Sequence, residues 1–156
     1  MKKILLALFF LAAAGVQGEN ILILRGQAVP PESSASFKSD TMNILLESVF
    51  TQAFDKNHIA FDAGLEAPDT LPDKAEIVQS AKKYGGDKVI AFVVFWKKGP
   101  KAALVFDRVE FLLARQTGQI LTQGKLADHF EALSPDEVKD ATELGQKMTD
   151  QLKSFY

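Results

Sequence analysis

The first half of this chain alternates between apolar blocks and polar, proline-containing blocks, and each block predicts one structural element. The apolar run at 20–25 predicts a buried strand. Residues 26–38 hold two prolines and several serines, which is typical of a loop. Ser39 and Asp40 can then cap a helix. Its expected buried face repeats at helical spacing and consists of Met42, Leu45, Leu46, Val49, Phe50 and Ala53.

A second strand, loop and helix follow the first helix. Residues 58–61 form a short apolar segment that predicts a strand, and 62–72 contain a glycine and two prolines that predict a second loop. Residues 72–84 are expected to form a helix, which Gly85 and Gly86 end. The residues that we expect this helix to turn inward are Ala75, Val78 and Ala81.

The strongest strand pattern lies at 88–96, where both alternating faces are apolar. A strand that is apolar on both faces belongs in the interior of a sheet that is covered on each side. Residues 102–115 and 119–127 predict two further strands, joined by a tight turn at Thr117 and Gly118.

The last predicted element is a helix that begins near Ser134. Ser134 and Glu137 have the spacing of a capping box, and Pro135 suits the first helical position. Its expected buried stripe consists of Val138, Ala141, Gly145, Met148 and Leu152. The order β-α-β-α-β-β-β-α predicts an α/β fold with a mixed sheet, in which a parallel core is extended by a C-terminal antiparallel meander and followed by the final helix.

Residues 1–18 have the three-part pattern of a secretory signal peptide. Lys2 and Lys3 precede an unbroken apolar run, and small residues stand before Glu19. The run is shorter than the roughly 20 residues of a membrane span. We therefore expect cleavage before Glu19, a single α/β domain over 19–156, and a periplasmic location with no membrane span after cleavage.

Composition narrows the possible partners. Loss of Lys2 and Lys3 with the leader leaves 16 basic and 20 acidic residues, a net charge of −4, whereas a nucleic-acid-binding protein needs a dense basic face. The chain contains no cysteine, so we expect neither disulfides nor the lipid anchor of a bacterial lipoprotein. The full sequence has 47% hydrophobic residues, and we expect the exported chain to form a soluble domain on its hydrophobic core alone.

Two segments resemble a group of small bacterial envelope domains. Residues 84–91 run from a helix through a glycine pair and Asp87 into an apolar strand, and 111–121 form a strand that ends in a Thr-Gly hairpin. Both are similar to segments of the amino-terminal domain of the Tol-Pal translocation protein, the curli secretion lipoprotein and the outer-membrane activators of penicillin-binding proteins. The resemblance implies a protein-binding module without catalytic residues.

No catalytic or cofactor motif accompanies this pattern. His58 and His129 are the only histidines; with Asp62 and Asp128 they could supply a metal site or an acid–base pair, but their spacing is not that of a metal motif. The serines at 33–39 are not on a nucleophile elbow, and no phosphate-binding glycine loop is present. We therefore expect no cofactor, no metal and no enzymatic activity.

The most unusual surface feature is the cluster of Trp96, Lys97, Lys98 and Lys101 at the turn between two strands. Such lysines commonly protect a sheet edge, but they can also steer an anionic partner, with the tryptophan supplying contact area. We predict a partner-binding site at these four residues. The expected function is a non-enzymatic accessory or adaptor domain of the cell envelope; the alternatives are a binder of a small ligand or peptide and, third, a small hydrolase or metal enzyme.

Overall fold

A computed structural model describes residues 19–55 and 59–155, so the expected leader, His58 and the last residue lie outside the described part. Eight helices and strands follow one another in the predicted order, joined by short 3-10 helices η1 (Pro31–Ser36), η2 (Pro100–Ala102) and η3 (Lys153–Phe155). They are β1 (Asn20–Ala28), α2 (Thr41–Asp55), β2 (Ile59–Gly64), α3 (Lys74–Tyr84), β3 (Lys88–Lys98), β4 (Leu104–Arg115), β5 (Ile120–Ala127) and α4 (Glu137–Leu152).

The five strands form one mixed sheet in the order β2-β1-β3-β4-β5. β1 pairs in parallel with both β2 and β3, whereas β3, β4 and β5 pair antiparallel as a meander. The predicted α/β class, parallel core, C-terminal meander and final helix are confirmed. β3 is the central strand, as its two apolar faces indicated, and Val93 in its middle is fully buried.

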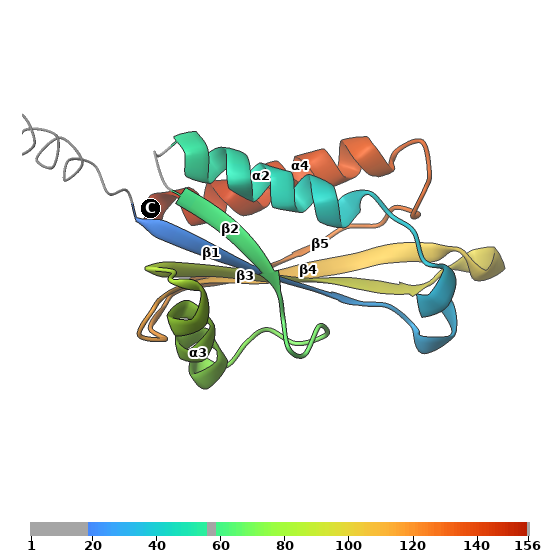
Figure 1. Cartoon of the computed structure of the whole chain (residues 1–156). Helices are drawn as coiled ribbons and strands as arrows, with labels where there is room; N and C mark the ends of the chain where they lie inside the picture. Colours follow the sequence, from blue (N-terminus) through green and yellow to red (C-terminus); the bar gives the residue numbers. More distant parts are fainter. Residues whose placement is uncertain (1–18, 56–58, 156) are drawn as a thin grey trace, which may run out of the picture.

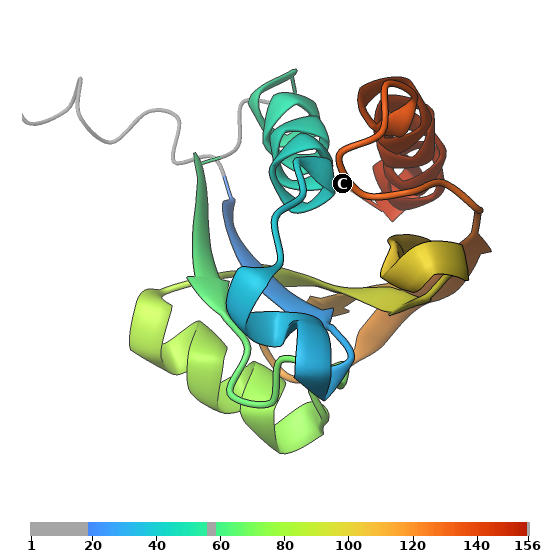
Figure 2. The ribbon, with the colours of Figure 1, turned by 90° about the vertical axis from the view of Figure 1, so that its right-hand side faces the viewer.

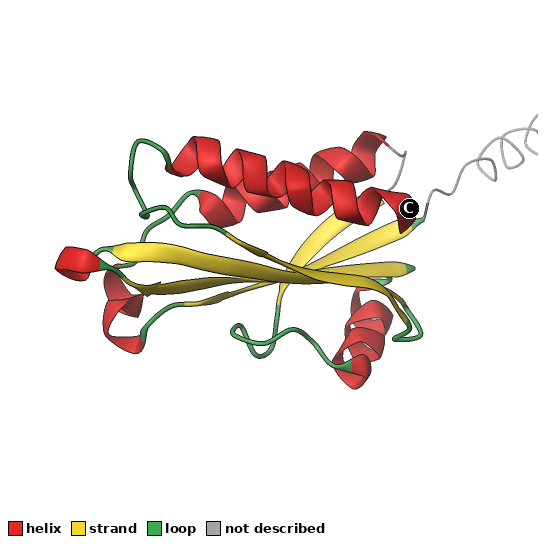
Figure 3. Ribbon diagram, turned by 180° about the vertical axis from the view of Figure 1, so that it is seen from behind, coloured by secondary structure: helices red, strands yellow, loops and turns green. Residues whose placement is uncertain are grey.

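Helices cover both faces of the sheet (Figures 1 and 2). α2 and α4 lie side by side on one face, and α3 lies on the other, which Figure 3 shows from behind. Each face has its own core. The larger, under α2 and α4, includes Ile23, Leu45, Ile90, Phe92, Phe111, Leu144 and Met148; the smaller, under α3, includes Leu22, Leu24, Ile77, Val89, Ala91 and Leu112.

β1 is longer than the sequence predicted. It runs through Gly26 to Ala28 instead of ending at Arg25, and the loop after it contains η1. Gly26 lies within the strand, and the position needs a glycine because the second loop crosses it. A Cβ on Gly26 would lie 2.3 Å from the carbonyl oxygen of Pro68. The glycine marks a close backbone approach and does not end the strand.

Two predicted helix faces are partly wrong. In α3 the buried residues are Ile77 and Ala81, while Ala75 is exposed and Val78 half-buried. In α4 the stripe from Ala141 to Leu152 is buried as predicted, but Val138 is 55% exposed. Glu137, beside it, points inward instead, because its carboxylate is hydrogen-bonded to the start of α2.

Candidate interaction surface

The lysine turn, residues 97–102, joins β3 to β4 at one end of the sheet, at the right in Figure 1. Its backbone is compact, because the Gly99 N–H donates to the Ala103 carbonyl at 2.8 Å. Lys101 and Ala102 both have left-handed backbone conformations, with φ of 57° and 60°. Residues other than glycine adopt such angles only where the surroundings fix them. The backbone of the turn therefore has a defined conformation.

Trp96, which the sequence placed at the tip, is buried below the turn and is only 5% exposed. Its ring packs against three aromatic rings from distant segments, with centroid distances of 5.1 Å to Phe37, 5.8 Å to Phe106 and 6.2 Å to Phe130. Its indole N–H donates to Gln27 Oε1 at 3.3 Å. Trp96 therefore anchors the base of the turn and presents almost no area to a partner.

The three lysines of the predicted site are exposed, but two of them have carboxylate partners. Lys97 Nζ lies 2.8 Å from Asp107 Oδ1, and Lys98 pairs with Glu32 of η1. The hydrogen bond from Lys97 is the main cause that lowers the pKa of Asp107, and the bond from Lys98 likewise lowers the pKa of Glu32. No ion pair of Lys101 is found in residues 19–55 and 59–155. Lys101 is therefore the cation of the turn that is available to an anionic partner.

A charged network that the sequence analysis did not single out continues from the lysine turn along β4. Arg108 donates to Asp107 Oδ2 and to Glu110 Oε1, each at 2.7 Å, and its guanidinium lies 3.7 Å from the centre of the Phe95 ring. These residues face the side of the sheet opposite to Trp96. The polar residues that interrupt the apolar pattern of 102–115 were the signal for it.

Of the two histidines of the alternative site, the structure describes only His129. His129 is exposed, and its backbone N–H donates to the side chain of the adjacent Asp128 at 2.8 Å. His58 lies outside the described residues. Within the described ranges no three residues of the types histidine, cysteine, aspartate and glutamate come together as a metal site.

The residue that sequence reasoning misread most is Glu137. Its side chain is 1% exposed and does not reach back to Ser134, so the predicted capping box is wrong. One carboxylate oxygen accepts instead from the start of α2: from the hydroxyl of Ser39, from Asp40 N at 3.0 Å, and from Thr41 N and Oγ1 at 3.2 and 2.8 Å. The other oxygen accepts from Leu133 N at 2.6 Å.

This buried carboxylate is well solvated by protein donors. Burial raises the pKa of Glu137, but hydrogen bonds from Ser39, from Leu133 N and from Thr41 outweigh burial, so the pKa lies below its ordinary value. The negative charge also faces the positive end of the α2 dipole. Glu137 therefore acts as the N-terminal cap of a neighbouring helix, and it locks α2 to the turn before α4.

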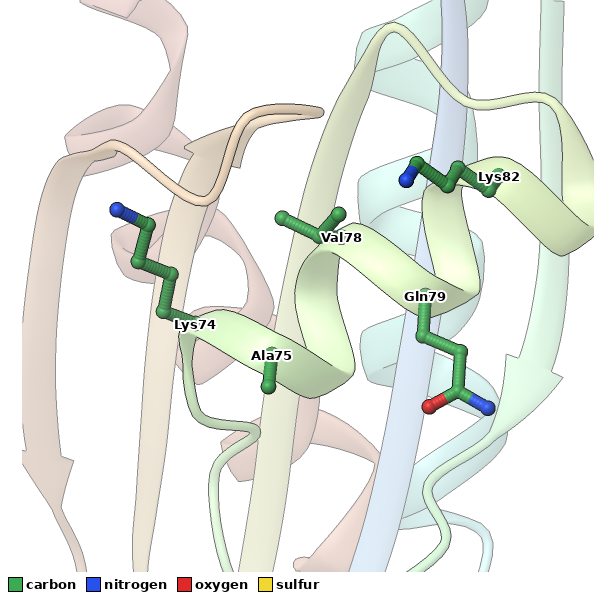
Figure 4. Close-up of a pocket in the computed structure, with 5 residues that line it drawn as sticks. All are labelled: Lys74, Ala75, Val78, Gln79 and Lys82. Carbon is green, nitrogen blue, oxygen red and sulfur yellow. The ribbon is translucent and has the colours of Figure 1, made fainter.

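The outer surface of α3 carries an open depression of about 590 Å³, the α3 groove (Figure 4). It is lined by Lys74, Ala75, Val78, Gln79 and Lys82. Ala75 and Val78, which the sequence analysis expected to face the core, are its apolar floor. Gly118 of the β4–β5 hairpin packs beside it, since a Cβ there would lie 2.5 Å from Lys74 Cγ.

No helix in the described part of the chain combines the length and the apolar character needed to cross a membrane. No family of sequences and no curated protein matches this chain.

Solved structures do resemble it. PelC from Paraburkholderia phytofirmans, a dodecamer, is similar at 15% identity over 87% of this chain and 88% of that chain, with a TM-score of 0.56. Lipoprotein GNA1162 from Neisseria meningitidis is similar at 12% identity over 87% of this chain and 99% of that chain, with a TM-score of 0.51. With these two structures, the expected resemblance to small bacterial envelope domains is confirmed for the fold. The C-terminal domain of LpoB from Salmonella enterica is similar at 19% identity over 80% of this chain and 93% of that chain, with a TM-score of 0.44.

Proposed function

We propose that this chain is a non-enzymatic accessory or adaptor domain that is exported to the periplasm and acts by protein–protein contact at the cell envelope. The leader pattern at 1–18 supports export. The fold shared with PelC and with lipoprotein GNA1162 supports an envelope role. GNA1162 is named a lipoprotein, whereas this sequence contains no cysteine.

The observation that carries the proposal is the lysine turn, with its compact backbone and its buried tryptophan anchor. The buried ring of Trp96 fixes its base, and the left-handed residues Lys101 and Ala102 fix its tip. A surface element that is ordered before it binds loses little conformational entropy on binding. Exposed cations on such an element accelerate association with an acidic surface. We therefore assign partner contact first to Lys101 and then to Lys97 and Lys98, whose ion-paired side chains are still half-exposed, with Trp96 as the support of the turn.

Capture of partners from envelope extract tests this assignment. Replacing Lys97, Lys98 and Lys101 with glutamate should reduce the amount of captured partner and make the remaining capture less sensitive to salt. Stability should change little, because exposed ion pairs contribute little to folding. The matched control is the triple replacement of the exposed Lys125, Lys139 and Lys147 with glutamate, which changes the net charge equally. Equal capture by wild type and the lysine-turn variant would contradict the proposal.

A further inference from the structure

Two large hydrophobic side chains are exposed at the start of α4 and in the loop before it. The leucine turn, residues 131–140, contains Leu133, which is 65% exposed, and Val138, which is 55% exposed. Both exposed fractions exceed those of every other large hydrophobic side chain in the described residues. An exposed apolar pair of this kind is a candidate contact for another surface.

The backbone of Leu133 is strained as well as exposed. Its φ is +60°, a left-handed conformation that glycine adopts at no steric cost and leucine does not. The Leu133 N–H is held in place by the buried carboxylate of Glu137 at 2.6 Å. A leucine with this backbone angle is less stable than a glycine would be, and its exposed side chain is not part of the hydrophobic core. Strained residues of this kind cluster where a side chain must be presented for a function.

The charges within the leucine turn itself are mainly negative. Glu131 and Asp136 are exposed and Asp140 is half-exposed, while Lys139 is the only cation among residues 131–140. The leucine turn is therefore an apolar projection within an acidic rim. A surface that fits it needs an apolar depression within a basic rim.

The α3 groove has that complementary chemistry. Its floor is formed by Ala75 and Val78, and its cationic edges are Lys74 and Lys82, as Figure 4 shows. Its volume of about 590 Å³ leaves ample room for an aliphatic side chain. The floor residues lie on the side of α3 next to the one that buries Ile77 and Ala81, and Val78 itself is half-buried.

The two surfaces cannot meet within one molecule. α4 lies on one face of the sheet and α3 on the other, so the sheet separates the leucine turn from the α3 groove (Figures 1 and 3). We propose that the occupant of the α3 groove is the leucine turn of a second copy of this chain. Such a contact is head-to-tail: each copy offers one surface of each kind, and repeated contacts give a closed ring or an open chain.

Analytical ultracentrifugation of the purified exported chain over a range of concentrations tests the proposal. Wild type should form assemblies larger than one chain. Leu133→Gly, which relieves the strained backbone, should sediment as a single chain and have unchanged or higher thermal stability. Ala75→Glu, which places a carboxylate on the groove floor, should also sediment as a single chain. The control Ala127→Glu changes an exposed alanine of β5 in the same way and should assemble as wild type does.

Mixing the two variants separates a head-to-tail contact from any other. The Leu133→Gly chain keeps an intact groove and the Ala75→Glu chain keeps an intact leucine turn, so the mixture should form a one-to-one dimer and nothing larger. A mixture that stays at single-chain mass overturns the proposal, and so does a wild type that remains a single chain at every concentration. The lysine-turn variant should assemble normally, which keeps this test independent of the proposed partner contact.

Discussion

Removing the carboxylate of Glu137 should destabilise the fold more than its position at the start of a surface helix suggests. Five donors from two segments converge on its oxygens: the hydroxyls of Ser39 and Thr41 and the backbone N–H groups of Asp40, Thr41 and Leu133. In Glu137→Ala the hydroxyls can turn elsewhere, and Thr41 N keeps Ser39 Oγ as an acceptor at 3.1 Å. The N–H groups of Asp40 and Leu133 lose the acceptor that the carboxylate gave them.

The expected magnitude follows from these two lost acceptors. These two hydrogen bonds are only partly buried, so water can replace part of what the carboxylate supplied, and each lost bond should cost about 0.5–1.5 kcal/mol. The free energy of unfolding should therefore fall by about 1–3 kcal/mol in Glu137→Ala, against the roughly 5–15 kcal/mol by which native domains are stable. Glu137→Gln keeps one acceptor oxygen and the side-chain volume, so it should lose about 1 kcal/mol.

Urea denaturation, followed by circular dichroism at several pH values, measures both effects. Because the folded pKa of Glu137 lies below its ordinary value of 4.5, its carboxylate contributes stability that is complete above pH 4.5. That contribution is lost as the pH falls through the folded pKa. The difference between wild type and Glu137→Gln should therefore be constant near neutral pH and shrink in acid.

A control and a contrary result complete the test. Asp150→Asn removes an exposed carboxylate that pairs only with Lys153 and Gln146 near it in the sequence, and it should change stability by less than about 0.5 kcal/mol. The reasoning is refuted if Glu137→Ala unfolds at the same urea concentration as Asp150→Asn, or if the wild-type and Glu137→Gln difference does not depend on pH.

Two further predictions concern the sheet and the leader. Val93→Asp places a charge in a fully buried position that pairs with the acidic Glu110 on β4, so the free energy of unfolding should fall by about 3–5 kcal/mol. Val138→Asp, at an exposed position, should change it little. Urea denaturation of both variants measures this, and a stable Val93→Asp would mean that β3 is not central. Mass spectrometry of the periplasmic protein should find a chain that begins near Glu19, and an intact leader in that fraction would remove the basis for the proposed location.

Sequence patterns predict the sheet well because the alternation of residues along a strand shows which of its faces are buried. β3 has apolar residues on both faces, and only a strand covered on both sides by other elements can bury all of them. The Thr117–Gly118 turn similarly fixes how β4 and β5 pair, since the Gly118 φ of +80° suits glycine. These signals lie within single segments, so the element order and the sheet type follow from them.

Helix faces are harder to predict because a partner far along the chain decides them. Val138 continues the apolar repeat of α4, yet Glu137 takes the inward position because Ser39 and Thr41, almost a hundred residues earlier, supply its hydrogen bonds. In α3, a stripe through Ala75 and Val78 and one through Ile77 and Ala81 differ by about a third of a turn of the helix. The second is buried, which leaves the first as the floor of the α3 groove.

The lysine turn also shows that burial depends on residues far along the chain, which the local sequence does not reveal. Trp96 and the lysines are adjacent in sequence, but alternate side chains of a strand point to opposite faces. Trp96 points toward the core under α2 and α4, where Phe37, Phe106 and Phe130 arrive from three separate segments. The sequence therefore indicated where the site lies. It could not show that Trp96 is buried while the lysines are exposed, because that depends on those distant rings. The lysines can act as a defined surface because the tryptophan beside them is not part of it.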